Sequence, residues 1–135
     1  MAKVLIMMGS ESDRERMEKA VPILEEAGVA TEVVVSSAHR DPERTAQIAS
    51  SAQENGFSVV ICGAGLSAAL PGVVAAHTKL PVIGVPLNAA LGGLDALLSV
   101  AQMPPGVPVA CVGIDNAKNA AHLALRILRL AGQVD

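Results

Sequence analysis

The sequence predicts an α/β fold, a three-layer α/β/α sandwich around a five-stranded parallel sheet, doubly wound in the flavodoxin-like manner. Short apolar segments typical of buried strands alternate five times with helical segments along the 135 residues. The connections between these segments are short, and neighbouring parallel strands are joined by helical crossovers of this kind. The length suits a single domain over residues 1–135, and the chain shows no repeat, linker or low-complexity segment.

Each element is placed by its apolar pattern and by the residues that begin or end helices. The first strand is a continuous apolar run, as expected for a strand covered on both faces. Ser10 or Ser12 can cap the first helix, Gly28 would end it, and Pro22 inside it would kink it. Pro71 is allowed in the first turns of the third helix. We expect strands at residues 3–8, 29–35, 58–62, 81–85 and 108–112, and helices at residues 12–27, 41–55, 66–77, 93–102 and 116–130.

The composition excludes several classes of protein. Hydrophobic residues make up 51% and charged residues 17% of the chain, which excludes a disordered protein. The net charge of −3, with one Phe and no Trp or Tyr, offers neither a basic surface nor an aromatic platform for nucleic acid, and no attraction to an anionic membrane. Two cysteines make no disulfide framework, and no signal-peptide pattern precedes them, so we expect a reduced, cytoplasmic protein.

The charged residues are unevenly distributed. Sixteen of the 23 lie within residues 1–56, and residues 57–78 contain none. A membrane span over this uncharged stretch is disfavoured because Gly63, Gly65 and Pro71 interrupt it. The second half of the chain has too few polar groups to cover a monomer of this size, and helices that are apolar on several faces are usually buried. We therefore expect a homo-oligomer larger than a dimer.

In a doubly wound fold the binding crevice lies at the carboxyl ends of the strands, so the loops that follow the strands are the candidate site. The first of these loops is Gly9-Ser10-Glu11-Ser12-Asp13. Its glycine, its two hydroxyls and the helix N-terminus behind it can hold a phosphate, and Asp13 suits ribose hydroxyls. Ordinary helix capping explains the same serines and aspartate, and the loop by itself does not decide between the two interpretations.

The loop after the second strand contains Ser37, His39 and Arg40, directly before the second helix. A guanidinium can bind phosphate through two parallel hydrogen bonds, and an imidazole can carry a proton near neutral pH. The alternative is a surface ion pair between Arg40 and Asp41 or Glu43. With the first loop on a neighbouring strand, these residues would form an anion site beside a proton carrier, which suits a phosphorylated substrate.

The third loop has the spacing G-x-G-x-x-A, but a dinucleotide site is disfavoured for two reasons. The glycines follow the third strand instead of the first, and no acidic residue occurs between Glu54 and Asp95 to bind a ribose. Small residues around Gly65 would instead leave space for a ring. His77 and His122 lack partners at metal-ligand spacing, so we predict no metal and no organic cofactor.

Several motifs in a fixed order, together covering nearly the whole chain, resemble the PurE family. The resemblance implies an enzyme of purine biosynthesis that forms 4-carboxy-5-aminoimidazole ribonucleotide, assembled as a homo-octamer. Many relatives carry a further C-terminal helix that reaches a neighbouring copy, whereas this sequence ends at Asp135. The matching segments are GSESD at residues 9–13, SAHR at 37–40, PVIGVP at 81–86, GLDALLS at 93–99, QMP at 102–104 and GVPVA at 106–110.

The resemblance also implies roles for particular residues. His39 would carry the proton at ring carbon C4, and the phosphorylated aminoimidazole ribonucleotide would be bound by Ser10, Ser12, Asp13, Ser37, Arg40 and Gly65. Ala69 stands where most mutases of the family have a second histidine, and Ser67 stands where the direct carboxylases have a serine. This loop resembles the carboxylase branch, whereas the longer segment 81–110 resembles the mutase branch. On the longer segment, isomerisation of N5-carboxyaminoimidazole ribonucleotide is slightly preferred over direct carboxylation of aminoimidazole ribonucleotide. A non-catalytic nucleotide-binding relative is the third hypothesis.

Overall fold

The structure is a computed structural model of the chain and describes residues 2–135. Its sheet has the strand order β2-β1-β3-β4-β5, and each neighbouring pair is parallel. This is the flavodoxin-like order, so the predicted fold class is confirmed. The strands of the described residues are β1 (Lys3–Met8), β2 (Ala30–Val35), β3 (Val59–Ala64), β4 (Val82–Pro86) and β5 (Ala110–Cys111).

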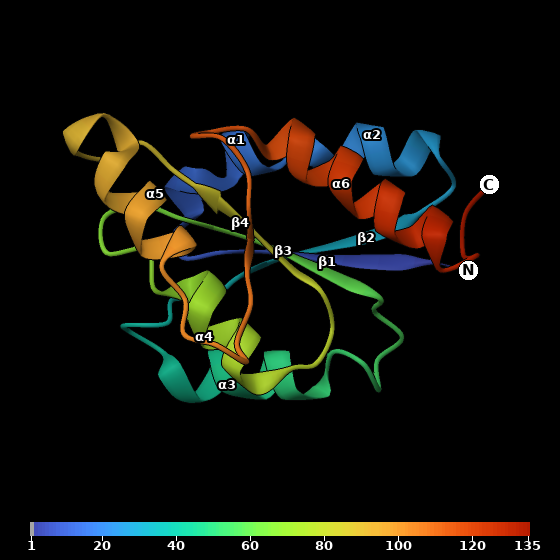
Figure 1. Cartoon of the computed structure of the whole chain (residues 1–135), viewed down its shortest axis with the longest axis horizontal. Coiled ribbons are helices and arrows are strands. Elements are labelled where there is room, and N and C mark those ends of the chain that lie inside the picture. Colours follow the sequence, from blue (N-terminus) through green and yellow to red (C-terminus); the bar gives the residue numbers. More distant parts are fainter. Residues whose placement is uncertain (1) are drawn as a thin grey trace.

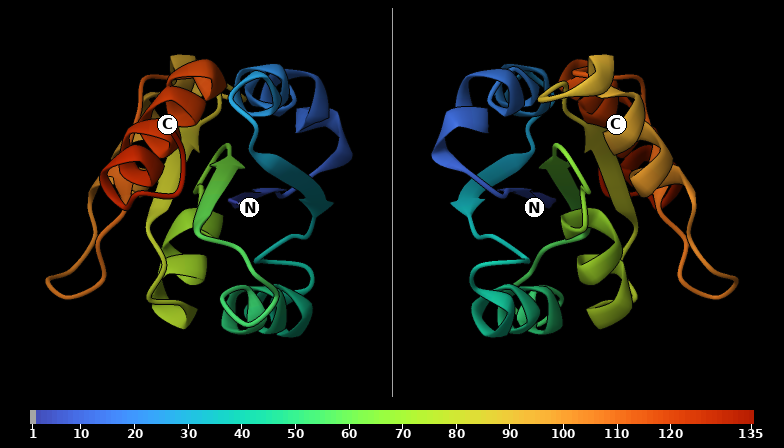
Figure 2. Two further views of the ribbon diagram at one scale, coloured as in Figure 1. Left: turned by 90° about the vertical axis from the view of Figure 1, so that its right-hand side faces the viewer. Right: turned by 90° about the vertical axis from the view of Figure 1, so that its left-hand side faces the viewer.

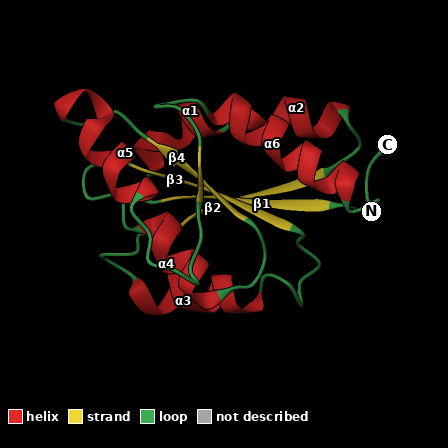
Figure 3. Ribbon diagram, in the orientation of Figure 1, coloured by secondary structure: helices red, strands yellow, loops and turns green. Residues whose placement is uncertain are grey.

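Helices cover both faces of the sheet (Figures 1 and 3). On one face lie α1 (Arg14–Met17), α2 (Ala20–Glu26) and α6 (Ala117–Leu130), and toward the other face pack α3 (Pro42–Ser51), α4 (Leu70–His77) and α5 (Leu94–Ala101). Two short 3₁₀ turns, η1 (Glu11–Asp13) and η2 (Leu91–Gly93), precede α1 and α5.

The core is divided into two apolar layers, one on each side of the sheet. Ile6 of β1 belongs to the layer beneath α2 and α6, which contribute Leu24 and Leu128. Leu5 and Met7 point to the opposite layer, which packs against α3 and α4. Because successive strand residues face opposite sides, this division explains why β1 is apolar and buried from residue 4 to residue 8.

The helix expected at residues 12–27 is broken into pieces, which corrects the prediction of one kinked helix. The interruption falls at Glu18 and Lys19, between α1 and α2. Pro22 has no N–H to donate to the carbonyl of Glu18, four residues earlier. That carbonyl instead accepts from the N–H of Val21 at 3.0 Å, one residue short of the α-helical spacing. The proline therefore interrupts the helix one turn before its own position in the sequence.

The third helix begins at Leu70, although residues 66–69 were also expected to be helical. Leu66 and Ala68 have positive φ angles of 55° and 37°, so the backbone turns before the helix starts. The N–H of Ala68 donates to the carbonyl of Gly65 at 2.9 Å and closes this turn. Pro71 occupies the first turn of α4, as predicted.

The last strand is also shorter than expected, because β5 has two residues where five were predicted. Residues 102–109, which connect α5 to β5, project from the body of the domain as the orange loop in Figure 2. A Cβ added at Gly72 of α4 would lie 3.0 Å from the Met103 sulfur, so Met103 anchors this loop on α4. Within residues 2–135, no helix is long and apolar enough to cross a membrane.

Candidate active site

A cavity of about 340 Å³ opens beyond the carboxyl ends of β1, β2 and β3. These three strands are neighbours in the sheet, so the loops that follow them meet at one edge, as the fold predicts. The cavity brings together every residue that the sequence singled out for catalysis or binding: Ser10, Ser12, Asp13, Ser37, His39, Arg40 and Gly65. Ala89, from the loop between β4 and η2, also lines the cavity and carried no chemical signal in the sequence.

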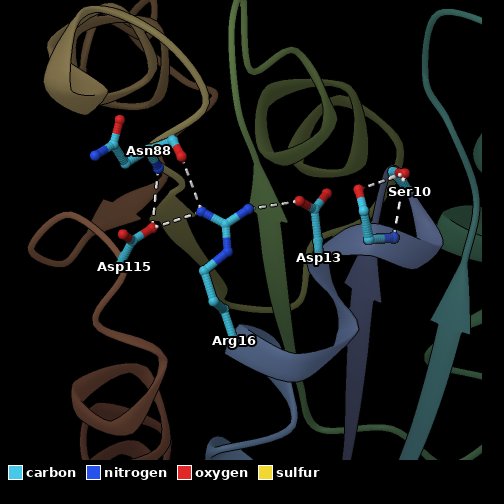
Figure 4. Close-up of polar contacts among 6 residues, drawn as sticks. Ser10, Asp13, Arg16, Asn88 and Asp115 are labelled. Atoms are coloured by element: carbon cyan, nitrogen blue, oxygen red, sulfur yellow. Dashed lines mark hydrogen bonds and ion pairs between the residues drawn. The ribbon is translucent and has the colours of Figure 1, made fainter.

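The loop after β1 is held by Ser10. The Ser10 hydroxyl accepts from the backbone N–H of Ser12 at 3.4 Å and lies 2.9 Å from the Ser12 hydroxyl (Figure 4). Ser10 is therefore a helix cap, and both hydroxyls remain exposed at the cavity. The helix behind them is one 3₁₀ turn followed by four residues of α1, which makes its dipole small. An anion at this loop would therefore be bound mainly by the two hydroxyls, and the helix N-terminus would contribute less than expected.

The loop after β2 is a tight turn fixed by both polar groups of Ser37. The Ser37 hydroxyl accepts from the N–H of Arg40 at 3.1 Å, and the Ser37 carbonyl accepts from the N–H of Asp41 at 2.9 Å. The Thr45 hydroxyl on α3 donates to the same carbonyl at 3.2 Å. This turn leaves His39 and Arg40 exposed at the cavity.

The electrostatics of the cavity favour an anionic ligand on the side of Arg40. Among the described residues, no carboxylate lies within 4.0 Å of the Arg40 guanidinium, so the alternative pairing with Asp41 or Glu43 is not formed. Asp13, in contrast, is paired with Arg16 at 2.9 Å. The wall formed by the segment between β3 and α4 is apolar and is lined by Ala64, Leu66, Ala68, Ala69 and Leu70. A ligand with a charged end and a flat apolar part matches this division.

Gly65 is required by close packing. A Cβ at this position would lie 2.9 Å from the Cβ of Ala89 and 3.2 Å from the carbonyl oxygen of Leu87. The glycine thus lets the loop after β4 approach the end of β3 and close that side of the cavity. Leu66 and Ala68, with their left-handed backbone, follow directly, and strained backbone of this kind is concentrated at functional sites.

The remaining histidines and the cysteines lie away from the cavity. His77 is exposed on α4, where its Nδ1 lies 2.8 Å from the carbonyl oxygen of Val73, and His122 is exposed on α6. Burial raises the pKa of the Cys62 thiol in β3, and it also raises the pKa of the half-buried Cys111. In the part of the chain that the structure describes, no three His, Cys, Asp or Glu side chains are grouped so that they could hold a metal ion.

Several known proteins are similar to this chain in sequence and in fold. The N5-carboxyaminoimidazole ribonucleotide mutase of Pyrococcus horikoshii is 60% identical over 124 residues, which cover 91% of this chain and 70% of that protein. The mutase of Saccharolobus solfataricus is 56% identical over 129 residues, covering 95% and 82%. The crystal structure of Treponema denticola PurE superposes with a TM-score of 0.84 at 32% identity, covering 96% of this chain and 82% of that one.

The profile of the AIR carboxylase family matches residues 3–134. Since that match includes all three loops of the cavity, and since relatives more than half identical cover over nine-tenths of the chain, this protein belongs to the AIR carboxylase family, which includes PurE.

Proposed function

We propose that this protein is an N5-carboxyaminoimidazole ribonucleotide mutase of purine biosynthesis, with His39 as its general acid and base. The observation that supports this most is that His39, the Ser10 and Ser12 hydroxyls and the Arg40 guanidinium line one cavity. This guanidinium pairs with no carboxylate of residues 2–135. The mutase name borne by its relatives points to the same reaction.

The two sides of the cavity correspond to the two parts of such a nucleotide. Arg40 and the hydroxyls of Ser10 and Ser12 would bind the phosphate, because charged donors form the strongest hydrogen bonds to phosphate oxygens. Asp13, next to them, would accept from ribose hydroxyls. The aminoimidazole would lie beside Gly65, against the apolar wall.

The chemistry needs one proton carrier and a closed space. The carboxyl group leaves N5 as carbon dioxide while His39 gives its proton to N5, and the enamine-like C4 then forms a new bond to the carbon dioxide. The adduct still carries the C4 proton, and its transfer to His39 restores the aromatic ring. A positioned base contributes roughly 10²- to 10⁴-fold. Holding carbon dioxide beside C4 adds the advantage of an effectively unimolecular step.

Ala69 supports direct carboxylation of aminoimidazole ribonucleotide as the second candidate reaction. It lines the cavity at the position where most mutases of the family have a second histidine. Among the described residues, His39 is the one imidazole that lines the cavity. In a mutase reaction His39 would therefore carry out every proton transfer that needs an imidazole. A carboxylase that takes free carbon dioxide would not need the second imidazole to release it from N5.

The two reactions are separated by offering the purified protein each substrate in parallel. One is N5-carboxyaminoimidazole ribonucleotide, the other is aminoimidazole ribonucleotide with bicarbonate, and the product is followed by its ultraviolet absorbance. Turnover of the first alone supports the mutase, and turnover of the second alone establishes the carboxylase. Turnover of neither, with nucleotide still bound, would indicate a non-catalytic relative.

The role of His39 is tested by His39→Asn, with His122→Asn as the matched control on the exposed face of α6. Loss of the base should lower kcat by about 10²- to 10⁴-fold while nucleotide binding persists. The control should keep its activity, because His122 lies outside the cavity. Undiminished turnover in His39→Asn would refute the assignment.

We also propose that the protein is a cytoplasmic homo-oligomer, with the octamer of its family as the expected size. Leu91, Leu94 and Leu98 are 79%, 54% and 53% exposed. Leu94 and Leu98 share one side of α5 by their spacing of four residues, and Leu91 lies in the turn η2 directly before this helix. Ile114, 37% exposed, packs next to Gly93 and extends this apolar surface. A second copy of the chain would cover it. Sedimentation of Leu94→Glu against wild type tests this, and a monomeric wild-type protein would refute it.

A further inference from the structure

Arg16 joins three separate segments beneath the cavity, although it does not itself line the cavity. Its Nη2 donates to Oδ1 of Asp13 at 2.9 Å, and its Nη1 donates to Oδ1 of Asp115 at 3.0 Å and to the carbonyl oxygen of Asn88 at 3.1 Å. Figure 4 shows the guanidinium between the two carboxylates, with Asn88 beside it. One side chain thus connects η1, the loop after β4 and the loop after β5.

Asp115 is built into the same cluster. Its Oδ1 also accepts from the backbone N–H of Asn88 at 2.9 Å, and its own N–H donates to the carbonyl oxygen of Pro86 at 2.8 Å. These bonds hold Asp115 in a left-handed conformation with φ of 58°, which a residue other than glycine rarely adopts. Asn88 precedes Ala89, so the cluster fixes the chain just before it reaches the cavity.

We propose that Arg16 is a positioning residue for substrate binding, which orients the Asp13 carboxylate toward the ribose hydroxyls. The proposal rests on the binding role of Asp13 proposed above. The bond to Arg16 occupies Oδ1 of Asp13, while Oδ2 has no hydrogen-bond partner among residues 2–135. A carboxylate held by one oxygen presents the other in a fixed direction, and an oriented acceptor loses less freedom on binding than a mobile one.

The positive charge of Arg16 also favours substrate binding, by offsetting the negative charge of Asp13. Asp13 lies in the loop that would bind an anionic phosphate, and an unpaired carboxylate there would repel it. The adjacent guanidinium offsets the negative charge of Asp13 without removing its capacity to accept hydrogen bonds. Arg16 is half-buried, so solvent screens this pairing less than it would screen an exposed pair.

Arg14 provides the contrast that distinguishes positioning from ordinary surface pairing. It pairs with Glu11 and with Glu18, three and four residues away along the chain; both partners are exposed, and Arg14 does not line the cavity. Such pairs contribute little to stability. Arg16 differs because two of its three bonds reach residues 72 and 99 positions away.

The test compares Arg16→Gln with Arg14→Gln, using ribose 5-phosphate and its 2-deoxy and 3-deoxy analogues as probes in NMR titrations. Wild type should prefer ribose 5-phosphate over at least one deoxy analogue by about tenfold, because an analogue that lacks the hydroxyl leaves the oriented acceptor unpaired. Arg16→Gln should lose this preference and Arg14→Gln should keep it. General structural damage would weaken all three ligands equally, and that outcome would overturn the proposal.

A double-mutant cycle adds a second readout in the enzyme assay. If Arg16 acts through Asp13, Arg16→Gln should raise KM about tenfold in the wild-type background and have no further effect in Asp13→Asn. Arg16→Lys, which keeps the charge, should restore part of the loss. If Arg16→Gln does not fold, Asp115→Asn serves instead, since it weakens the same cluster while keeping an acceptor for Asn88.

The sugar titrations do not depend on the identity of the base. Failure of the wild-type protein to turn over either carboxylation substrate would refute the proposed function while the ribose preference still tests Arg16. An unchanged ribose preference in Arg16→Gln would refute the positioning role while the mutase assignment stands.

Discussion

Gly65→Ala introduces a single methyl group at the point where two loops of the cavity touch. The added Cβ would lie 2.9 Å from the Ala89 Cβ and 3.2 Å from the Leu87 carbonyl oxygen. Carbon atoms in contact lie about 3.5–4.0 Å apart, so the loop after β4 has to withdraw by roughly half an ångström. Neither contact is the flexible end of a long side chain, and Asn88, between them, is held by Arg16.

Because Arg16 and Asp115 both hydrogen-bond to the backbone of Asn88, the loop after β4 cannot move away freely to make room for the methyl group. Overpacking of this kind costs about 1–3 kcal/mol, which corresponds to a fall in Tm of roughly 4–12 °C for a domain of this size. Withdrawal of Ala89 also opens the cavity on the side of the apolar wall. A displacement of about 1 Å can cost on the order of 10²-fold in rate, so half of that should lower kcat/KM by about tenfold.

Gly9→Ala is the matched control for stability, since it makes the same change in another loop of the same cavity. A Cβ at Gly9 would meet no atom within 4 Å, so its Tm should stay the same or rise slightly. Thermal unfolding and steady-state kinetics of the two variants are measured side by side. A Gly65→Ala protein with wild-type Tm and wild-type kcat/KM would show that the loop after β4 does not need this close contact.

Two further predictions concern the core. Gly84→Ala should lower the free energy of unfolding by about 2–3 kcal/mol, because its Cβ would lie 2.4 Å from Cγ1 of Val100, a β-branched side chain that cannot easily turn away. Gly113→Ala is the control and should change the free energy of unfolding little, because its Cβ would have no neighbour nearer than 3.8 Å. Urea titrations of both variants check this. Burial raises the pKa of Cys62 by disfavouring its thiolate, so Cys62 should resist iodoacetamide at pH 8 in the native protein and react once the chain is unfolded. Mass spectrometry of the native protein showing Cys62 alkylated as fast as a free thiol would contradict this.

The fold class was predictable because it depends on a pattern that repeats along the whole chain, whereas the ends of several elements depend on single contacts. Pro22 predicts an irregularity in the first helix. Only the structure shows that the carbonyl of Glu18 accepts from the N–H of Val21 and that α1 ends there. In the sequence, Leu66 and Ala68 resemble the first turn of a helix, because neither is a glycine, the residue type that would indicate a positive φ. Their left-handed backbone arises from the turn closed by Gly65, and the local sequence does not encode it.

The same distinction separates the residues of the site. Ser10, His39 and Arg40 could be predicted because each carries its own chemistry and follows a strand that the fold brings to a common edge. Arg16 could not, since in the sequence it is a helical arginine three residues after Asp13, which is the pattern of an ordinary surface pair. Its contacts with segments beyond residue 80 exist only once the sheet has assembled. Sequence patterns therefore identify groups that touch a ligand more readily than the groups that hold them in place, because a positioning residue is defined by its partners and those partners are distant in the chain.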